Sequence, residues 1–138
     1  MAFLLDTTIL SIHLKRPDLT FTRFVTHGGQ LFTSQVVVGE LYAWAFRAKT
    51  PGNHEERLAS LDDLRLQVEV LPFDDDCAKK FGEMKATMGT AAGAIDLMIA
   101  ATSVVLDAAV VSCDSDFFAI QRIFPEIHVI NWFEETLP

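Results

Sequence analysis

A long apolar stretch with acidic residues near both ends constrains the fold of this chain more than any other feature. It covers residues 94–118, AIDLMIAATSVVLDAAVVSCDSDFF, with Asp96 near its start and Asp114 and Asp116 near its end. The run from Met98 to Val105 predicts a helix that is apolar on nearly every side, and such a helix is buried. A short strand, 109–111, follows it. Because a buried carboxylate costs several kcal/mol unless it is paired or bound to a metal, we expect other groups to meet these acids.

Strands and helices alternate along the whole chain. The apolar runs and their flanking Gly, Pro and polar residues predict strands at 2–5, 31–33, 68–71, 109–111 and 128–130. They predict helices at about 9–15, 18–27, 36–48, 55–66, 74–88, 98–105 and 117–123. This alternation indicates an α/β domain with a mostly parallel sheet and right-handed crossovers.

Turn and cap residues predict where several helices begin and end. The hydroxyls of Thr7 and Thr8 offer caps for the first helix, and Pro17 is expected to break it. The segment 50–53, Thr-Pro-Gly-Asn, is expected to be a loop. The acidic run 74–76 follows Pro72 at a predicted helix start, so these acids are expected to cap that helix.

Length and composition indicate one soluble domain over residues 1–138. Half of the residues are hydrophobic, which is enough for a full core. The apolar runs end well before the roughly 20 residues that a membrane span needs, and the N-terminus lacks the basic segment of a signal peptide. Cys77 and Cys113 are too far apart in sequence for a CxxC motif. We therefore expect a cytoplasmic protein with no membrane association.

The formal net charge of −8 has the wrong sign for a protein that wraps nucleic acid through a general basic surface. The 11 Lys and Arg residues are scattered, with small clusters at 15–16, 47–49 and 79–85. A solvated surface explains these clusters most simply. Either nucleic acid is not the substrate, or its contacts are local and bound cations neutralise some of the acids.

Acidic residues follow two of the predicted strands. Asp6 ends the first strand, and Asp114 and Asp116 follow the fourth. In an open parallel sheet the ligand site lies at the carboxyl ends of the strands, where the strand order reverses. If the first and fourth strands are neighbours, these acids face each other across that crevice.

Two further acids stand at positions that point to the same place. Glu40 shares a helix face with Val36 and Trp44 and interrupts an apolar stripe, and Asp96 lies near the start of the buried helix. Carboxylates brought within a few Å raise one another's pKa values unless a cation compensates. Mg²⁺ or Mn²⁺ suits an all-oxygen ligand set, and such an ion lowers the pKa of bound water and steadies in-line attack on phosphorus.

Each acid also has a simpler explanation. Asp6 could only cap the helix that follows it, Glu40 could extend to solvent, and Asp96 could be a first-turn acid favoured by the helix dipole. Asp114 and Asp116 could be turn or cap residues. The residues alone leave these alternatives open.

Four motifs in this order resemble those of PIN-domain ribonucleases. They are Leu4–Thr7, Glu40–Leu41, Asp96–Ala101 and Val110–Phe117. The length and the motif order look like the VapC toxins of bacterial toxin–antitoxin pairs. The resemblance spans nearly the whole chain.

This resemblance implies a PIN-like domain over residues 1–138, with three layers, α/β/α, and a central, mostly parallel, five-stranded sheet. It also implies Mg²⁺- or Mn²⁺-dependent endoribonuclease activity, a homodimer, and a cognate antitoxin protein that blocks the site. The family's catalytic roles carry over to Asp6, Glu40, Asp96 and Asp114, with Asp116 as an additional or substitute acid. Asp6, Asp96 and Asp114 are the implied metal ligands.

Three positions depart from the family pattern. Thr8 stands where Asn is frequent, Ser112 replaces a frequent Thr, and Trp44 occupies a position where Gly is common. The Trp44 difference puts the shape of the substrate in doubt rather than the acid set.

Two other functions are weighed against the nuclease: an acidic, Mg²⁺-binding regulatory module like a receiver domain, and a PIN fold that only binds protein or RNA.

Overall fold

The computed structural model describes residues 1–134 and contains a five-stranded sheet in which every pair of neighbouring strands is parallel. The strand order is β3-β2-β1-β4-β5. The strands are β1 (Ala2–Leu5), β2 (Leu31–Ser34), β3 (Glu69–Leu71), β4 (Ala108–Val111) and β5 (His128–Ile130). The predicted parallel sheet is confirmed, and each strand lies within a residue or two of its predicted position.

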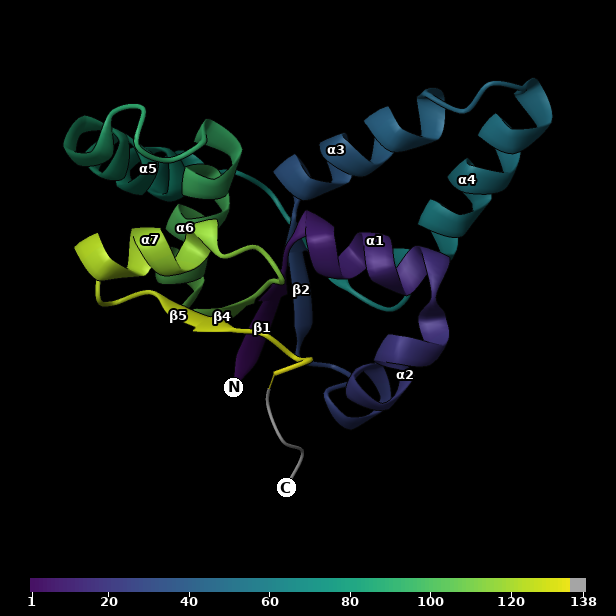
Figure 1. The fold of residues 1–138 in the computed structure, drawn as a ribbon, viewed down its shortest axis with the longest axis horizontal. Helices are drawn as coiled ribbons and strands as arrows, with labels where there is room; N and C mark the ends of the chain where they lie inside the picture. Colours follow the sequence, from purple (N-terminus) through teal and green to yellow (C-terminus); the bar gives the residue numbers. More distant parts are fainter. Residues whose placement is uncertain (135–138) are drawn as a thin grey trace.

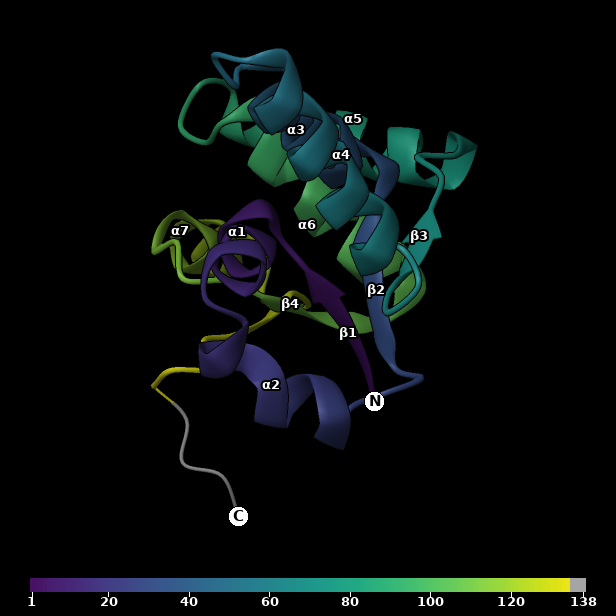
Figure 2. The same ribbon diagram turned by 90° about the vertical axis from the view of Figure 1, so that its right-hand side faces the viewer.

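Helices cover both faces of the sheet and give three layers. They are α1 (Thr7–Lys15), α2 (Pro17–Thr26), α3 (Gln35–Phe46), α4 (Pro51–Leu64), α5 (Asp75–Met88), α6 (Ala94–Leu106) and α7 (Asp116–Ile123). In Figure 1, α5, α6 and α7 lie on one side of the strands and α1 to α4 on the other. In the turned view of Figure 2, α3 and α4 lie in front of α5 and α6. The predicted three-layer α/β/α architecture is therefore confirmed.

Strands β1 and β4 are central neighbours, as the site hypothesis requires. Their register pairs Leu4 with Val110 and Leu5 with Val111. The chain leaves β1 toward β2 and leaves β4 toward β5, so the direction of winding reverses between these two strands. The next residues along the two strands, Asp6 and Ser112, consequently emerge side by side at the carboxyl edge of the sheet, where ligands bind in such folds.

The strands that carry this edge are almost entirely buried. Residues 108–111 of β4 and residues 3–5 of β1 are all in the core, as expected for parallel strands covered by helices on both faces. Helix α6 adds Leu97, Ile99, Ala100 and Ala101 to this core, which explains why it is apolar on nearly every side. A firmly packed β1–β4–α6 unit thus supports the acids at the end of the sheet.

Several helix starts differ from the sequence prediction, and α6 begins at Ala94 rather than at residue 98. Asp6, rather than Thr7 or Thr8, caps α1 by accepting a hydrogen bond from the backbone N–H of Ile9. Pro17 begins α2 at its first position, where its missing N–H costs nothing, besides ending α1. The prediction of a loop at 50–53 is wrong, because Pro51, like Pro17, is the first residue of a helix: it begins α4, and the hydroxyl of Thr50 caps that helix.

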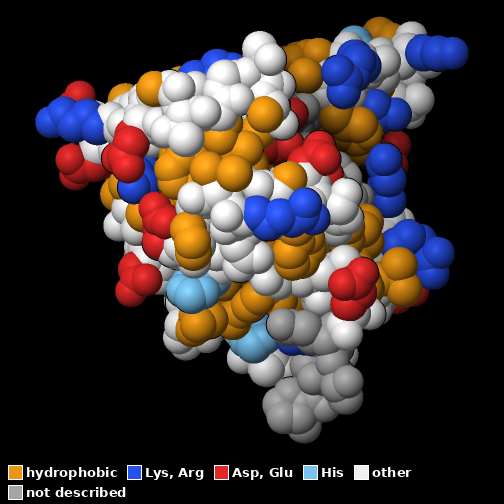
Figure 3. Space-filling model, turned by 60° about the vertical axis from the view of Figure 1, so that its left-hand side comes forward, with side chains coloured by type: hydrophobic (Ala, Val, Ile, Leu, Met, Phe, Trp, Pro, Cys, Tyr) orange, Lys and Arg blue, Asp and Glu red, His pale blue; other side chains and the backbone are white. Residues whose placement is uncertain are grey.

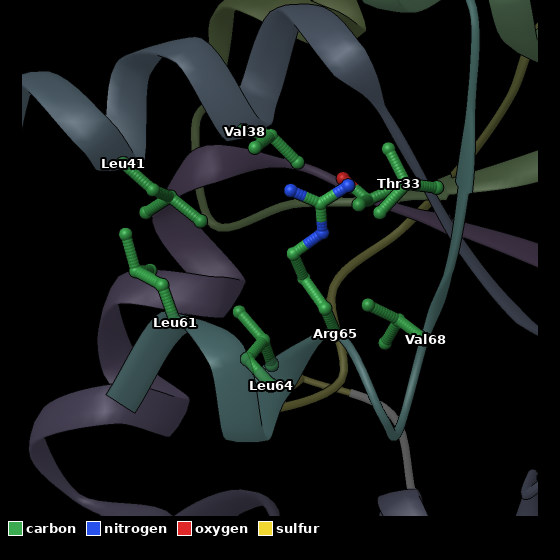
Figure 4. A pocket seen from close by; sticks show the side chains of 8 residues that line it. Thr33, Val38, Leu41, Leu61, Leu64, Arg65 and Val68 are labelled. Carbon is green, nitrogen blue, oxygen red and sulfur yellow. The ribbon is translucent and has the colours of Figure 1, made fainter. Parts of the chain in front are cut away.

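Helices α3 and α4 close over the sheet through leucine and valine side chains. Figure 4 shows Val38 and Leu41 of α3 facing Leu61 and Leu64 of α4, with Arg65 beside them. The void among these side chains is ≈ 10 Å³, about the space of one water molecule. This packing fixes α3, and with it Glu40, against the rest of the fold.

Within residues 1–134, no helix combines the length and the apolar character that crossing a membrane requires.

Candidate active site

Asp6 lies at the carboxyl end of β1 and is only 2% exposed. One carboxylate oxygen, Oδ1, accepts hydrogen bonds from the N–H of Ile9 at 3.0 Å and from the hydroxyl of Thr8 at 2.7 Å. The other, Oδ2, accepts a 2.5 Å hydrogen bond from the hydroxyl of Ser112. Asp6 therefore caps α1, as its simpler explanation proposed, and it also ties β1 to the end of β4.

Three further acids converge beside it. Asp96 in the first turn of α6, Asp114 in the loop after β4, and Asp116 at the start of α7 each place a carboxylate oxygen so that the three oxygens lie within 4.8 Å of one another. The loop carrying Asp114 is held at its base by the N–H of Ser112, which donates to the carbonyl of Ile130 at 3.0 Å. The helix and the two strand ends thus bring acids from distant parts of the chain together.

Glu40 reaches the site from the opposite layer. It lies in the second turn of α3, is half-buried, and accepts a short hydrogen bond from the hydroxyl of Thr7. Its negative charge acts on Asp96, which places it near the other acids. The simpler expectation, that Glu40 only extends to solvent, does not describe this side chain.

Burial and mutual repulsion shape the electrostatics of the site. The pKa of Asp96 is raised from 3.8 to about 6, first by burial and then by the charges of Asp114, Asp116, Asp6 and Glu40. All four of these charged neighbours are carboxylates. A half-buried acid surrounded by like charges favours a cation that compensates them.

The pKa of Asp6 is also raised, and burial is the main cause. The charge of Asp114 adds to this rise, whereas the hydrogen bonds from Ser112, Thr8 and Ile9 oppose it. These bonds stabilise the ionised form, because a carboxylate that accepts several hydrogen bonds holds its charge more easily. The local sequence thus supplies donors for the most buried acid of the group.

The oxygens of Asp96, Asp114 and Asp116 fit a small divalent cation. Oxygens bound to one Mg²⁺ at about 2.1 Å lie roughly 3 to 4 Å apart, so a spread of 4.8 Å or less closes around the ion with small side-chain rotations. Mg²⁺ and Mn²⁺ prefer carboxylate ligands, whereas Zn²⁺ and Cu²⁺ sites are typically rich in His and Cys. This group differs from the implied ligands Asp6, Asp96 and Asp114, because Asp116 takes the place of Asp6. Its chemistry suits a hard divalent cation.

Acidic and basic side chains are distributed unevenly over the surface. On the face shown in Figure 3, acidic side chains lie in a hollow between hydrophobic ones, and Lys and Arg side chains border it in separate groups. These groups do not join into a continuous basic stripe on this face. Separate basic groups on an acidic protein with a net charge of −8 agree with the expectation that an anionic ligand makes local rather than extended contacts.

Comparison with known proteins shows the family of this chain. The family model described as the PIN domain matches residues 3–123, which is most of the chain. The chain belongs to the PIN-domain family. The matched range includes all five acids of the site, so the resemblance predicted from short motifs is confirmed.

Curated relatives of this PIN domain carry ribonuclease names. A protein of Haemophilus influenzae strain Rd named Ribonuclease VapC2 is 30% identical over 105 residues, which span 73% of this chain and 77% of that protein. A protein named Ribonuclease VapC from Haemophilus influenzae strain 86-028NP matches equally well.

Solved structures share the fold of the PIN domain. A chain of DNA-bound VapBC from Salmonella typhimurium has a TM-score of 0.85 at 25% identity, covering 96% of this chain and 98% of that one. A chain of VapBC2 from Rickettsia felis, bound to a DNA fragment from its promoter, has a TM-score of 0.83 at 22% identity, covering 96% and 99%. The likeness to the second structure concerns the fold alone.

Sequence reasoning found the acids of the PIN domain but not the hydroxyl groups that hold them. Thr7 and Thr8 were expected to cap α1, and instead they contact Glu40 and Asp6. Ser112 was noted only for keeping a hydroxyl, and it donates to the most buried acid. A signal was available, since hydroxyl residues stand next to the acids at the ends of both central strands.

Proposed function

We propose that this PIN domain is a Mg²⁺- or Mn²⁺-dependent endoribonuclease and the toxin of a toxin–antitoxin pair. The observation that carries the proposal is the convergence of the Asp96, Asp114 and Asp116 oxygens within 4.8 Å, with the pKa of Asp96 raised to about 6 by burial and by neighbouring acids. Bringing these carboxylates together costs free energy unless a cation compensates their charge, and their oxygens are suited to hold one.

The relatives support the choice of RNA as substrate and of an antitoxin as partner. The curated relatives are named ribonuclease VapC, and the solved neighbours come from VapBC toxin–antitoxin structures, some with promoter or other DNA. We extend RNA cleavage and a cognate antitoxin protein from these relatives to this chain. From the resemblance in the sequence we further propose a homodimer, a single domain over residues 1–138 and a cytoplasmic location.

The acids receive distinct roles in this proposal. Asp96 and Asp114 hold the ion, and Asp116 supplies the third nearby oxygen. Asp6, which the resemblance implied as a ligand, lies outside this group of three; it borders the site on the buried side, where its hydrogen bonds keep the carboxylate oriented. Glu40, anchored by Thr7, adds negative charge from α3.

The bound ion supplies a water molecule of lowered pKa and charge stabilisation for attack on phosphorus. The protein's own contribution is to hold five acids on a rigid edge formed by β1, β4 and three helices. Because the site and RNA are both anionic, RNA binding at the site depends on the divalent ion, and flanking phosphates contact only a few basic side chains.

The test is cleavage of labelled single-stranded RNA by the purified chain with Mg²⁺, with Mn²⁺ and with EDTA. We expect cleavage with either metal and none in EDTA. The variant Asp96→Asn keeps the shape of the side chain, removes the charge, and is expected to lose cleavage while remaining folded.

Asp62→Asn provides the matched control, because it makes the same change of charge at an exposed position of α4. Cleavage that persists in EDTA, or that Asp96→Asn leaves at the wild-type rate, would contradict the proposal. A folded wild type that binds RNA with metal and never cleaves it would favour the non-catalytic PIN fold.

A further inference from the structure

Thr8 connects the two central strand ends, although it belongs to neither of them. It is the second residue of α1 and is half-buried. Its hydroxyl donates to Asp6 Oδ1 at 2.7 Å and accepts a hydrogen bond from the backbone N–H of Cys113 at 3.0 Å. One side-chain oxygen thus bridges the acid at the end of β1 and the loop after β4, residues 112–115.

The direction of each hydrogen bond follows from the number of protons available. An ionised carboxylate only accepts and a backbone N–H only donates, so the single hydroxyl proton of Thr8 goes to Asp6. The proton of Ser112 goes to the other oxygen of Asp6 in the same way. The two hydroxyl oxygens lie 3.4 Å apart with no proton left for each other, and each is free to accept from the loop.

Both hydroxyls use this capacity on successive amides of the loop. Thr8 accepts from the N–H of Cys113, and Ser112 accepts from the N–H of Asp114 at 2.9 Å. The carboxylate of Asp114 then accepts from the N–H of Asp116 at 2.9 Å. A continuous chain of hydrogen bonds therefore runs from Asp6 through the two hydroxyls to the acids that follow β4.

We propose that Thr8 is a positioning residue for the metal site: its hydroxyl holds the 112–115 loop so that the carboxylate of Asp114 stays within ligand distance of Asp96 and Asp116. This inference rests on the proposed function, since it concerns the same ion. Thr8 does not touch the ion itself. It acts through Asp6 and the Cys113 amide, as groups that orient metal ligands generally do.

Thr8 gives a cleaner test than Ser112. Ser112 is buried and donates to the buried oxygen of Asp6, so its removal also disturbs the core. Thr8→Val keeps the β-branched shape on α1 and removes only the hydroxyl. Thr8→Ser restores the hydroxyl without the methyl group, and Thr22→Val makes the same change at an exposed position of α2.

The experiment is calorimetric titration of Mn²⁺ into the full chain for the wild type and these three variants. We expect Thr8→Val to weaken Mn²⁺ binding roughly tenfold or more. Thr8→Ser is expected to stay within about twofold of the wild type, as is Thr22→Val, because hydroxyl geometry and not side-chain size carries the effect. Amide exchange in the metal-free protein is the second readout, and the Cys113 N–H is expected to exchange faster in Thr8→Val.

The outcomes separate this inference from the proposed function. A wild type that binds no Mn²⁺ would overturn both. Equal affinities of the wild type and Thr8→Val would overturn the inference alone, and so would unchanged exchange at Cys113. If Thr8→Val does not fold, Thr8→Ala takes its place with the same expectations. A role limited to fold stability would lower the melting temperature and leave the affinity of the folded protein unchanged.

Discussion

Two acidic regions of this molecule contain the same residue type and behave in opposite ways. Residues 74–76 are three consecutive acids at the start of α5, all exposed. Asp74 accepts a hydrogen bond from the N–H of Cys77 at 3.0 Å, and Asp75 forms an ion pair with Lys79 at 3.2 Å. The backbone hydrogen bond from Cys77 is the main reason that the pKa of Asp74 is lowered.

The acids at the sheet edge are far apart in sequence and close in space. Burial and four neighbouring carboxylates raise the pKa of Asp96 to about 6, in the opposite direction from Asp74. The comparison shows that density of acids along the sequence does not make a metal site. What distinguishes the sheet edge is that acids from distant parts of the chain, several of them partly or fully buried, face one another, and the meeting of two strand ends brings this about.

The largest expected difference between the two regions is in catalysis. Asp114→Asn removes one proposed ligand charge and is expected to lower RNA cleavage by at least about 100-fold. Asp75→Asn makes the same chemical change at the start of α5 and is expected to leave the rate unchanged. Single-turnover cleavage at saturating Mn²⁺ measures both. Equal losses in the two variants would mean that net charge, and not the site, controls the rate.

The pH dependence of stability is expected to differ in sign between the regions. The pKa of Asp96 is raised in the folded protein. Its contribution to stability is therefore fully present at a pH below 3.8, the pKa of the unfolded chain, and is lost as the pH rises through about 6. The pKa of Asp74 is lowered, so its contribution is present above 3.8 and is lost as the pH falls.

Asp96→Asn isolates the first of these contributions, because an amide does not titrate. In EDTA, the stability of this variant relative to the wild type is expected to be about 1–2 kcal/mol greater at pH 8 than at pH 4.5, after allowance for the solvent screening of a half-buried group. Urea unfolding at the two pH values gives the difference. A constant difference between the variant and the wild type would show that the pKa of Asp96 is not raised.

The smallest expected effect concerns the cap of α5. Asp74→Ala removes the side-chain acceptor for the N–H of Cys77 and is expected to lower the melting temperature slightly, with no change in RNA cleavage. Asp74→Asn keeps an acceptor and is expected to melt close to the wild type. A loss of cleavage in either variant would connect this region to the site and weaken the contrast between the two.

Much of the fold could be predicted because the local signals agree with the tertiary structure. The apolar runs of β1 and β4, the apolar helix α6, and the acids directly after the strands all follow from short stretches of sequence. Asp74 as a helix cap was predicted for the same reason, since capping depends on residues a few positions apart.

The details of the site depend on strand register, which short stretches do not encode. Asp6 meets Ser112 because Leu5 pairs with Val111, and Thr8 meets Cys113 because α1 starts at that same edge. The Pro51–Gly52 dipeptide is typical of turns, whereas the Thr50 cap makes Pro51 the first residue of α4. In each case a contact between distant residues, or a competing local role, decided the outcome.

The central claim is that acids from α6, from the loop after β4 and from α7 hold one divalent ion. The most direct test is an anomalous difference map from a crystal of the chain grown with Mn²⁺. We expect a peak between the carboxylates of Asp96, Asp114 and Asp116, at the roughly 2.0–2.3 Å typical of such ions and their oxygen ligands. Ordered carboxylates with no peak at millimolar Mn²⁺, or a peak only at residues 74–76, would contradict the account.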